Sequence, residues 1–587
     1  MNRKTVLLCL CVCTGYLSAI GQVSEPQLRM TLPASWDENW FGSPAVYDLD
    51  GDGDMEIIAG RHSVLYVWDA TGTLLWRAPV GENSTSTNDH GKSRQYAAPV
   101  VGDLDGDGNG EIAVCYADSV SVYDHAGIHL PGWPQNFPGS TNEIRAIAGS
   151  DLDRNGTVEI LVIKTSEAPV TVVWDIQGKV ITGWPQVVGY EDCENFGGYN
   201  QNIGAADLDG DSIPEIISSY DMCYIGIMRP NGAPVESHSM FFPAGPWVCS
   251  VPMFHDIDLA KQGWGPNMED RDEFTDSPPS FGDIDGDGIL ELVLYSDHEL
   301  AGEYINRGNC LWVFNADLTR VPGFETPICS GMPLFTEWQN NIVQVAPAVA
   351  VANITGDSRP EIVTPSYDGI MRCFSPDGDS MWAYSFDVPG DPFIGASGPV
   401  IGDLNNDNIP EVIFTTYSID QDKSHLIILD NTGAELHKVA ISKRGSMSPP
   451  TLADVDGDKQ VEIVLSLKDV LGGGDGGVQI WDVASAKDNL LPWPTGRGNN
   501  LRNGLPANIG VNTGIKHFSG HKKGFILPVH TQVQVFNVKG QIIYSKLMQG
   551  KEELGVILSD IELLPGVFVV SVLLNKKHLY NKIIYFK

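Results

Sequence analysis

The chain has 587 residues, 42% of them hydrophobic, and a formal net charge of −38 at pH 7. This length allows several domains or one large repeat architecture, and the 63 glycines and 37 prolines suit a β-rich protein with many turns. The acidic excess excludes nucleic acid as a partner, because phosphate binding needs a basic surface.

The first 21 residues are predicted to be a signal peptide. Arg3 and Lys4 precede the apolar run 6–20, and small residues at Ala19 and Gly21 offer a cleavage site before Gln22. The run is too short to favour a membrane span, and no other stretch approaches one. The mature chain is therefore expected to be exported and to have no transmembrane segment.

Seven cysteines remain after the predicted cleavage. Export permits disulfides, but an odd number leaves at least one thiol free or paired outside the chain. Cys310 and Cys329 form the best local pair. Cys115 and Cys373 lie in apolar strand patterns and are expected to be buried thiols.

One acidic motif of nine residues recurs eight times, 48 to 76 residues apart. Self-similarity on this scale indicates a repeat architecture. The copies are DLDGDGDME from Asp48, DLDGDGNGE from Asp103, DLDRNGTVE from Asp151, DLDGDSIPE from Asp207, DIDGDGILE from Asp283, NITGDSRPE from Asn353, DLNNDNIPE from Asp403 and DVDGDKQVE from Asp454.

Each copy is followed by a strand pattern, such as EIIAG or EVIFT, and then by a second strand that ends in a polar turn. Several units add a short fourth element, and LPWPTG at Leu491 is assigned to this place in the last unit. Each unit is therefore predicted to be a four-stranded antiparallel meander. Packing such sheets radially leaves few exposed edges, which favours an all-β fold with an eight-bladed, or alternatively seven-bladed, β-propeller.

The repeated units resemble FG-GAP repeats, also called VCBS or integrin α-type repeats. FGDIDGDG at Phe281 is the best match, and the resemblance extends over residues 40 to 505. It implies a propeller domain over residues 22–505 whose acidic loops bind calcium.

The acidic motif itself has the chemistry of a Ca²⁺ loop. Calcium takes six to eight oxygen ligands, and positions 1, 3, 5 and 9 of the motif supply carboxylates. Position 7 would add a backbone carbonyl, and glycine at position 6 permits the sharp turn. The EF-hand has its glutamate at position 12, so that fold is excluded, and magnesium is disfavoured because it retains waters.

Asp and Gly are also good turn residues, but eight copies with glutamate at position 9 favour a metal function over plain turns. The Asn353 copy has Thr355 at position 3 and is expected to bind weakly or not at all. The predicted ligands are Asp48, Asp50, Asp52, Asp54, Glu56, Asp103, Asp105, Asp107, Asn109, Glu111, Asp151, Asp153, Asn155, Glu159, Asp207, Asp209, Asp211, Glu215, Asp283, Asp285, Asp287, Glu291, Asp403, Asn405, Asp407, Glu411, Asp454, Asp456, Asp458 and Glu462.

The acidic loops are first turns of their blades and are expected to share one face of the propeller, with the long irregular segments on the other. Long loops on a rigid scaffold are where recognition usually resides. Their aromatic residues could stack on sugars or anchor a protein: Tyr190, Phe196, Tyr199, Trp247, Trp264 and Trp338. We therefore predict a secreted or surface-bound calcium-binding propeller for glycan or extracellular protein ligands.

The alternative is a calcium-dependent polysaccharide lyase or glycosidase. His90, His255 and His298 lie among acids on the long-loop face, with Asp256, Asp258, Glu269 and Asp270 near in sequence. The sequence shows no nucleophile elbow, zinc-spaced histidine pair or phosphate loop, and no pair of catalytic acids can be singled out. No catalytic residue is assigned, and a binding role is favoured.

The composition changes near the C-terminus, where residues 515–587 hold ten lysines against four acidic residues. A stretch rich in Gly and Asn from Asn499 to Ser519 is expected to be mobile, with residues 506–519 as the linker. VFNVKG, then IELLPGVFVVSV, then a terminal lysine resemble the type IX secretion C-terminal sorting domain of Bacteroidetes-type bacteria. That resemblance implies an Ig-like β-sandwich over residues 520–587, an interaction with the secretion machinery, and export through the outer membrane.

Overall fold

The computed structural model describes residues 22–34, 42–79, 94–186, 197–219, 224–241, 251–262, 271–274, 276–299, 306–331, 348–388, 394–469, 476–484, 486, 490–507, 526–527, 531–537, 542–547, 552–553, 566–574 and 577–586. The chain divides into two compact units, residues 1–511 and 512–587. The first unit is an eight-bladed β-propeller, which confirms the predicted all-β class and the choice of eight blades over seven.

Each blade is an antiparallel sheet that contains one acidic motif, and the blades are numbered here in the order of the motifs. Blade 1 contains β2 (Ala45–Tyr47), β3 (Glu56–Arg61), β4 (Val64–Asp69) and β5 (Leu74–Pro79). Blade 2 contains β6 (Val100–Gly102), β7 (Glu111–Tyr116), β8 (Ser119–Tyr123) and β9 (Gln135–Asn136). Blade 3 contains β10 (Ile144–Ser150), β11 (Glu159–Lys164) and β12 (Thr171–Trp174).

Blades 4 and 5 follow in the same order and are joined by a segment with the short helix α1 (Ile257–Lys261). They contain β13 (Ile203–Ala206), β14 (Glu215–Ser219), β15 (Tyr224–Met228) and β16 (Val251–Pro252); and β17 (Arg271–Glu273), β18 (Ser280–Gly282), β19 (Glu291–Glu299), β20 (Asn306–Phe314) and β21 (Ile328–Cys329).

Blades 6 to 8 complete the ring. They contain β22 (Ala350–Ala352), β23 (Glu361–Ser366), β24 (Ile370–Phe374) and β25 (Ser380–Ser385); β26 (Ile394–Ala396), β27 (Val400–Gly402), β28 (Glu411–Ser418), β29 (His425–Leu429) and β30 (Glu435–Ala440); and β31 (Thr451–Ala453), β32 (Glu462–Ser466) and β33 (Val478–Asp482) together with β1 (Gln27–Leu32).

The outer strand of blade 8 comes from the other end of the propeller sequence. Strand β1 pairs antiparallel with β33, from Gln27 opposite Asp482 to Leu32 opposite Val478. The assignment of LPWPTG at Leu491 to the fourth strand of this blade is therefore wrong. The N-terminal strand closes the ring, and this pairing protects an edge that would otherwise be exposed.

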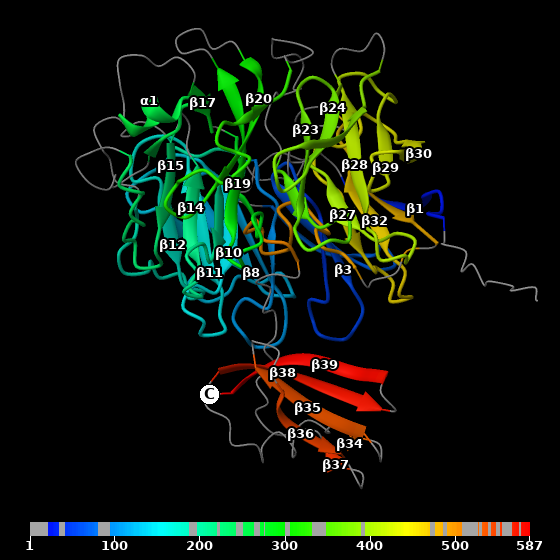
Figure 1. The fold of residues 1–587 in the computed structure, drawn as a ribbon. Coiled ribbons are helices and arrows are strands. Elements are labelled where there is room, and N and C mark those ends of the chain that lie inside the picture. The colour runs from blue at the N-terminus through cyan, green and yellow to red at the C-terminus, as the bar shows by residue number, and fades with distance from the viewer. Residues whose placement is uncertain are drawn as a thin grey trace, which may run out of the picture. The chain divides into compact units, whose positions relative to one another are not determined.

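Residues 490–505, which we call the central strap, line the middle of the propeller (orange in Figure 1). Carbonyls of the strap accept hydrogen bonds from the innermost strands of several blades: Asn500 from Val101, Leu501 from Gly149, Asn503 from Ala205, Gly504 from Phe281, Trp493 from Ile401 and Pro494 from Leu452. The expectation of a mobile stretch from Asn499 is wrong for residues 499–505, because this part is buried and bonded to the blades.

Two arginines fix the strap. The fully buried Arg502 guanidinium donates to the carbonyls of Pro99, Gly496 and Pro44 at 2.8–3.1 Å. Arg497, also fully buried, donates to the carbonyl of Ile203 at 2.6 Å and to that of Pro279 at 3.3 Å. Carbonyl groups of blades 1, 2, 4 and 5 are thereby held to one segment.

The core lies between the faces of neighbouring blades. The second strands β3, β7 and β11 are buried at every position, because blades pack on both of their sides. One cluster shows the pattern, since it joins Ile58 and Leu65 of blade 1 to Val101, Ile112 and Val114 of blade 2. The sulfur chemistry agrees with the sequence analysis: Cys310 and Cys329 form a disulfide, and Cys115 and Cys373 are buried free thiols.

The second unit contains two antiparallel sheets. β36 (Ile542–Leu547), β35 (Thr531–Asn537), β38 (Gly566–Leu574) and β39 (Lys577–Phe586) form one, and β34 (Ile526–Leu527) pairs with β37 (Glu552–Glu553). The described strands of this unit all lie within residues 520–587, the range assigned to a C-terminal domain from the sequence. The Ig-like sandwich stays a prediction.

Candidate functional site

The acidic motif forms the same hairpin loop in all eight blades. Its position-9 residue begins the second strand of the blade and pairs with the last residue of the first strand, as Glu56 does with Tyr47 and Glu462 with Ala453. All eight glutamates are at most 6% exposed. In each, Oε2 accepts the backbone N–H of position 2 at 2.6–2.9 Å, so one carboxylate oxygen anchors the loop.

The other acids of the loop fold it around its own backbone. At position 5, Oδ1 accepts the N–H of position 7 at 2.7–2.9 Å in every copy, for example between Asp107 and Asn109. At position 1, Oδ2 accepts the N–H of position 6 in six copies, as between Asp48 and Gly53. Position 6 has a left-handed backbone in seven of the eight loops, and Ser212, Asn408 and Lys459 adopt it where glycine is missing.

These contacts bring the predicted ligands at positions 1, 3 and 9 close together, but not those at positions 5 and 7. One oxygen each from positions 1, 3 and 9 lies within 4.8 Å of the others in the loops that begin at Asp48, Asp103, Asp151 and Asp207. The position-5 side chain uses its Oδ1 to close the turn. The backbone N–H of Asp54 and the side-chain amide of Asn109, both at position 7, donate to this oxygen. Positions 1, 3 and 9 are therefore the centre of these four loops.

The glutamates lie in an environment that disfavours their charged form. Burial, together with the neighbouring aspartates, raises the pKa of Glu111, Glu159 and Glu411 to about 8. The same causes raise the pKa of Glu56 and Glu291 to about 7. A cation in the loop would remove this penalty, because it favours the ionised carboxylate.

Two buried aspartate oxygens in the loops have no hydrogen-bond partner among the described residues. They are Oδ1 of Asp103 and Oδ1 of Asp283, and both are buried. An unpaired buried oxygen is costly, and a bound cation supplies what it lacks. The residues present thus fit an ion that takes oxygen ligands.

In the Asp454 loop, an arginine lies against the carboxylates. Arg29, on the closing strand β1, contacts Asp456 Oδ2 at 2.8 Å and Glu462 Oε1 at 3.0 Å, and it also pairs with Asp482. The guanidinium brings a positive charge to the glutamate oxygen that faces the loop. This pairing could not be predicted from the sequence, because Arg29 and Glu462 are 433 residues apart.

The Asp207 loop has the same arrangement with a local arginine. Arg229, which follows β15, contacts Asp209 Oδ2 at 2.8 Å, Glu215 Oε1 at 3.3 Å and Asp211 Oδ2 at 3.6 Å. In two other loops a neutral side chain takes the glutamate oxygen: Thr355 donates to Glu361 and Asn405 to Glu411.

The four remaining loops, which begin at Asp48, Asp103, Asp151 and Asp283, are called the open loops. No donor among the described residues bonds to Oε1 of their glutamates. Neighbouring open loops are also joined, since Gly110 N–H donates to Leu49 O and Val158 N–H to Leu104 O, at 2.7 and 2.8 Å. An ion in one loop would thus stiffen the next.

At the other end of the blades, an arginine is layered on two aromatic rings. The Arg145 guanidinium lies 4.2 Å from the ring centre of Tyr96 and 5.4 Å from that of Tyr199, and its Nε donates to Glu143 at 2.7 Å. These residues precede or begin the first strands of blades 2 to 4, opposite the acidic loops, as predicted for the long-loop face. Tyr190, Phe196, Trp247, Trp264 and Trp338 lie outside the described residues.

Two buried amides accompany this group. Gln95 is 1% exposed and neither atom of its side-chain amide has a hydrogen-bond partner among the described residues. Asn200 is 2% exposed and donates to Asp276 at 2.6 Å, while its Oδ1 has no partner there. Buried polar atoms of this kind can form hydrogen bonds with a polar ligand or with water.

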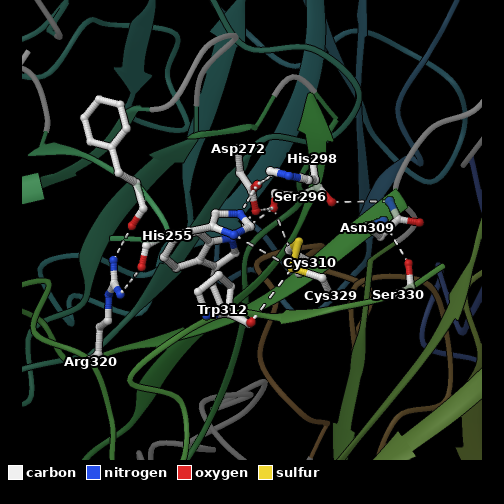
Figure 2. Close-up of polar contacts among 12 residues, drawn as sticks. His255, Asp272, Ser296, His298, Asn309, Cys310, Trp312, Arg320, Cys329 and Ser330 are labelled. Atoms are coloured by element: carbon white, nitrogen blue, oxygen red, sulfur yellow. Dashed lines mark hydrogen bonds and ion pairs between the residues drawn. A yellow bond between two sulfur atoms is a disulfide. The ribbon is translucent and has the colours of Figure 1, made fainter. Parts of the chain in front are cut away.

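Two of the three histidines that were predicted to lie on this face are close together in the structure. His255 and His298 meet at Asp272 (Figure 2). Asp256 instead caps the helix α1, and Asp258 pairs with Lys261. His90, Glu269 and Asp270 lie outside the described residues. Asp272 was missed because nothing in the sequence distinguishes it from many other acids.

In the described part of the chain, no helix is long and apolar enough to cross a membrane.

Together, the fold and the loops define an eight-bladed β-propeller with one acidic hairpin loop in each blade. Residues 48–114 match the FG-GAP-like repeat family model, in agreement with the predicted resemblance. A comparison with curated proteins finds no match.

Solved structures with similar folds include the V. cholerae biofilm matrix protein Bap1, at 15% identity, a TM-score of 0.45, and coverage of 78% of this chain and 91% of that chain. Rhamnogalacturonan lyase YesW has 16% identity, a TM-score of 0.45, and coverage of 80% and 77%. The Dos1 propeller has 11% identity, a TM-score of 0.42, and coverage of 77% and 96%. At these identities the likeness concerns the fold alone.

Proposed function

We propose that this protein is an extracellular calcium-binding β-propeller that acts as a binding or adhesion module for a glycan or protein ligand. The observation that carries the calcium assignment is the convergence of three carboxylate oxygens, one of them from the buried glutamate, in the open loops that begin at Asp48, Asp103 and Asp151. The donor set consists of oxygens, which suits Ca²⁺, while nitrogen- and sulfur-seeking metals find no preferred ligand there.

We assign calcium to the four open loops and leave the Asp403 loop, with Asn405 at position 3, as a weaker fifth site. In the Asp207 and Asp454 loops, Arg229 and Arg29 supply the positive charge that an ion would bring. Their acids are Asp207, Asp209, Asp211, Glu215, Asp454, Asp456, Asp458 and Glu462. A guanidinium and a calcium ion would compete for these oxygens, so we propose that both loops are closed to the metal.

The number of bound calcium ions tests this assignment. Arg229→Ala should add one ion, because it frees Asp209 and Glu215. Glu111→Gln should remove one, because it deletes a charged ligand of an open loop. Arg359→Ala is the matched control: this arginine pairs with Asp377 beside the Asn353 loop, which lacks carboxylates at positions 1 and 3. Equilibrium dialysis with metal analysis gives the counts. An unchanged count in both loop variants would contradict the assignment.

The ligand is proposed to bind at the face opposite the acidic loops. Tyr96, Arg145 and Tyr199 offer aromatic and cationic surface, and Glu143 and Asp276 offer acceptors for hydroxyl groups. Rings with polar neighbours suit sugar stacking as well as protein anchoring. The rigid propeller would fix these groups, which lowers the entropic cost of binding.

Arrays of glycans and extracellular matrix proteins, probed with and without EDTA, test the binding role. We expect one ligand class to be retained in calcium, and Arg145→Ala or Tyr199→Ala to weaken its binding by about tenfold or more, as at interface hot spots. Lys438→Ala, on the exposed face of β30, should bind as the unaltered protein does. Unsaturated or newly reducing sugar products after incubation would replace the binding role with a lyase or glycosidase.

We propose further that residues 520–587 are a type IX sorting domain and that the protein reaches the outer surface of a Bacteroidetes-type cell. The proposal is supported by the strand-rich, basic second unit and its terminal lysine. A chain that ends at Val511 should accumulate in the periplasm of the host, as measured by cell fractionation. Normal surface or medium levels of that chain would show that the tail does not direct export.

A further inference from the structure

Blade 5 has a second candidate metal centre at the end opposite its acidic loop. Strand β17 provides Asp272, β19 provides Ser296 and His298, β20 provides Trp312, and His255 precedes α1. Asp272 lies directly opposite His298 in the β17–β19 pairing. Figure 2 shows the two imidazoles turned towards the same carboxylate.

The carboxylate of Asp272 has no exposed surface and is surrounded by donors. Its Oδ1 faces His255 Nε2 at 2.6 Å and His298 Nδ1 at 2.9 Å. Its Oδ2 accepts from Trp312 Nε1 at 2.5 Å and from the Ser296 hydroxyl. Trp312 and Ser296 therefore fix one oxygen, and the other is shared by two nitrogens.

We propose that His255 Nε2, His298 Nδ1 and Asp272 Oδ1 bind a divalent transition-metal ion of the zinc class. Two imidazoles and one carboxylate are a donor set that zinc prefers and calcium does not, and catalytic zinc sites often have three protein ligands and one open position. The site is thus distinct in chemistry and location from the acidic loops.

The observed geometry needs little change to admit the ion. With metal–ligand distances of about 2.0–2.1 Å, tetrahedral donors lie roughly 3.3 Å apart, so His255 Nε2 and His298 Nδ1 would move about 0.7 and 0.4 Å away from Oδ1. The imidazole side chains are 22% and 13% exposed, which gives the ion a path from solvent. Each neutral ring would carry its proton on the other nitrogen, so binding needs a change of tautomer.

Neighbouring groups among the described residues hold the ligands in place. Arg320 donates to the His255 carbonyl at 3.1 Å and lies 5.0 Å above the Trp312 ring, which fixes the backbone of His255. Cys310 lies within 4.8 Å of the ligand atoms, but its sulfur is bonded to Cys329. It is therefore not counted as a ligand, and the fourth position is left for water or a substrate oxygen.

Zinc titration of the full-length protein, with its loops first saturated in millimolar calcium, tests the site. We expect one tightly bound zinc ion per chain in competition with a chromogenic chelator. His255→Gln and His298→Gln should each weaken zinc binding by about 100-fold, because glutamine keeps a hydrogen bond to Asp272 but is a poor zinc ligand. His125→Gln, at an exposed turn of blade 2, is the matched control and should leave the affinity unchanged.

A second measurement keeps the test decisive if a variant folds poorly. Cobalt in the unaltered protein should show the intense visible bands of a tetrahedral site with nitrogen ligands. A weak octahedral spectrum, an absence of zinc binding beyond the acidic loops, or full affinity in both histidine variants would overturn the proposal and leave a hydrogen-bond cluster. None of these results bears on the calcium count of the open loops.

Discussion

Chelation of calcium should lower the melting temperature of the propeller by roughly 10 °C. An ion that binds only the folded state contributes about 2.7 kcal/mol at a hundredfold excess over its Kd, so four open loops contribute about 11 kcal/mol. A propeller of this size has an unfolding entropy near 1 kcal/mol per degree, which gives the expected shift. Differential scanning calorimetry in calcium and in EDTA measures it.

The metal-free protein should also respond to pH with a defined sign. The folded-state pKa of the buried glutamates is about 7 to 8, above the ordinary value near 4.3. Their contribution is therefore fully present below pH 4 and is lost as the pH rises through 7 to 8. In EDTA the melting temperature should rise when the pH falls from 8.5 to 6, and in calcium this trend should reverse because the ion needs ionised ligands. Equal melting in calcium and EDTA would contradict calcium binding.

Removal of the central strap should abolish cooperative folding of the propeller, while removal of everything beyond it should not. A chain that ends at Val511 keeps residues 490–505 and should show the propeller's normal unfolding transition. A chain that ends at Asn489 loses the bonds to the first strands of seven blades and leaves their N–H and C=O groups unpaired. Circular dichroism and calorimetry of the two chains make the comparison.

A point variant tests the contribution of the strap's hydrogen bonds to stability without shortening the chain. Arg502→Ala leaves the buried carbonyls of Pro44, Pro99 and Gly496 without their donor, at an expected cost of about 3 kcal/mol or more. Arg154→Ala is the control, since this arginine is exposed at a loop tip. Normal cooperativity in the chain that ends at Asn489 would show that the strap is only an appendage.

The repeated loop was predictable because its chemistry is local. Nine residues contain the turn, the anchoring glutamate and the start of the next strand, so eight copies could be counted and their blades inferred. The Cys310–Cys329 disulfide was likewise found from residues that are near in sequence.

The missed features depend on contacts between distant residues. Strand β1 meets β33 across about 450 residues of sequence, and its short run of alternating residues resembles many other strands. The part of the strap from Asn499 was expected to be mobile because Gly and Asn are turn residues, whereas its backbone groups bond to the first strands of the blades. The identity of the open loops also depended on Arg29, whose partner loop is known only once the ring is closed.

The junction between β1 and β33 sets the order in which the protein can reach its final form. The β1 segment is synthesised before all the blades' other strands, yet its partner strand appears only after more than four hundred further residues. Contacts of such long range slow folding, and the unpaired strand is an edge to which other chains can add. We therefore expect the pairing of β1 with β33 to be a late step of folding, which brings Arg29 to the acids of the Asp454 loop. A chaperone that covers β1 until β33 has been synthesised would protect the protein during this interval.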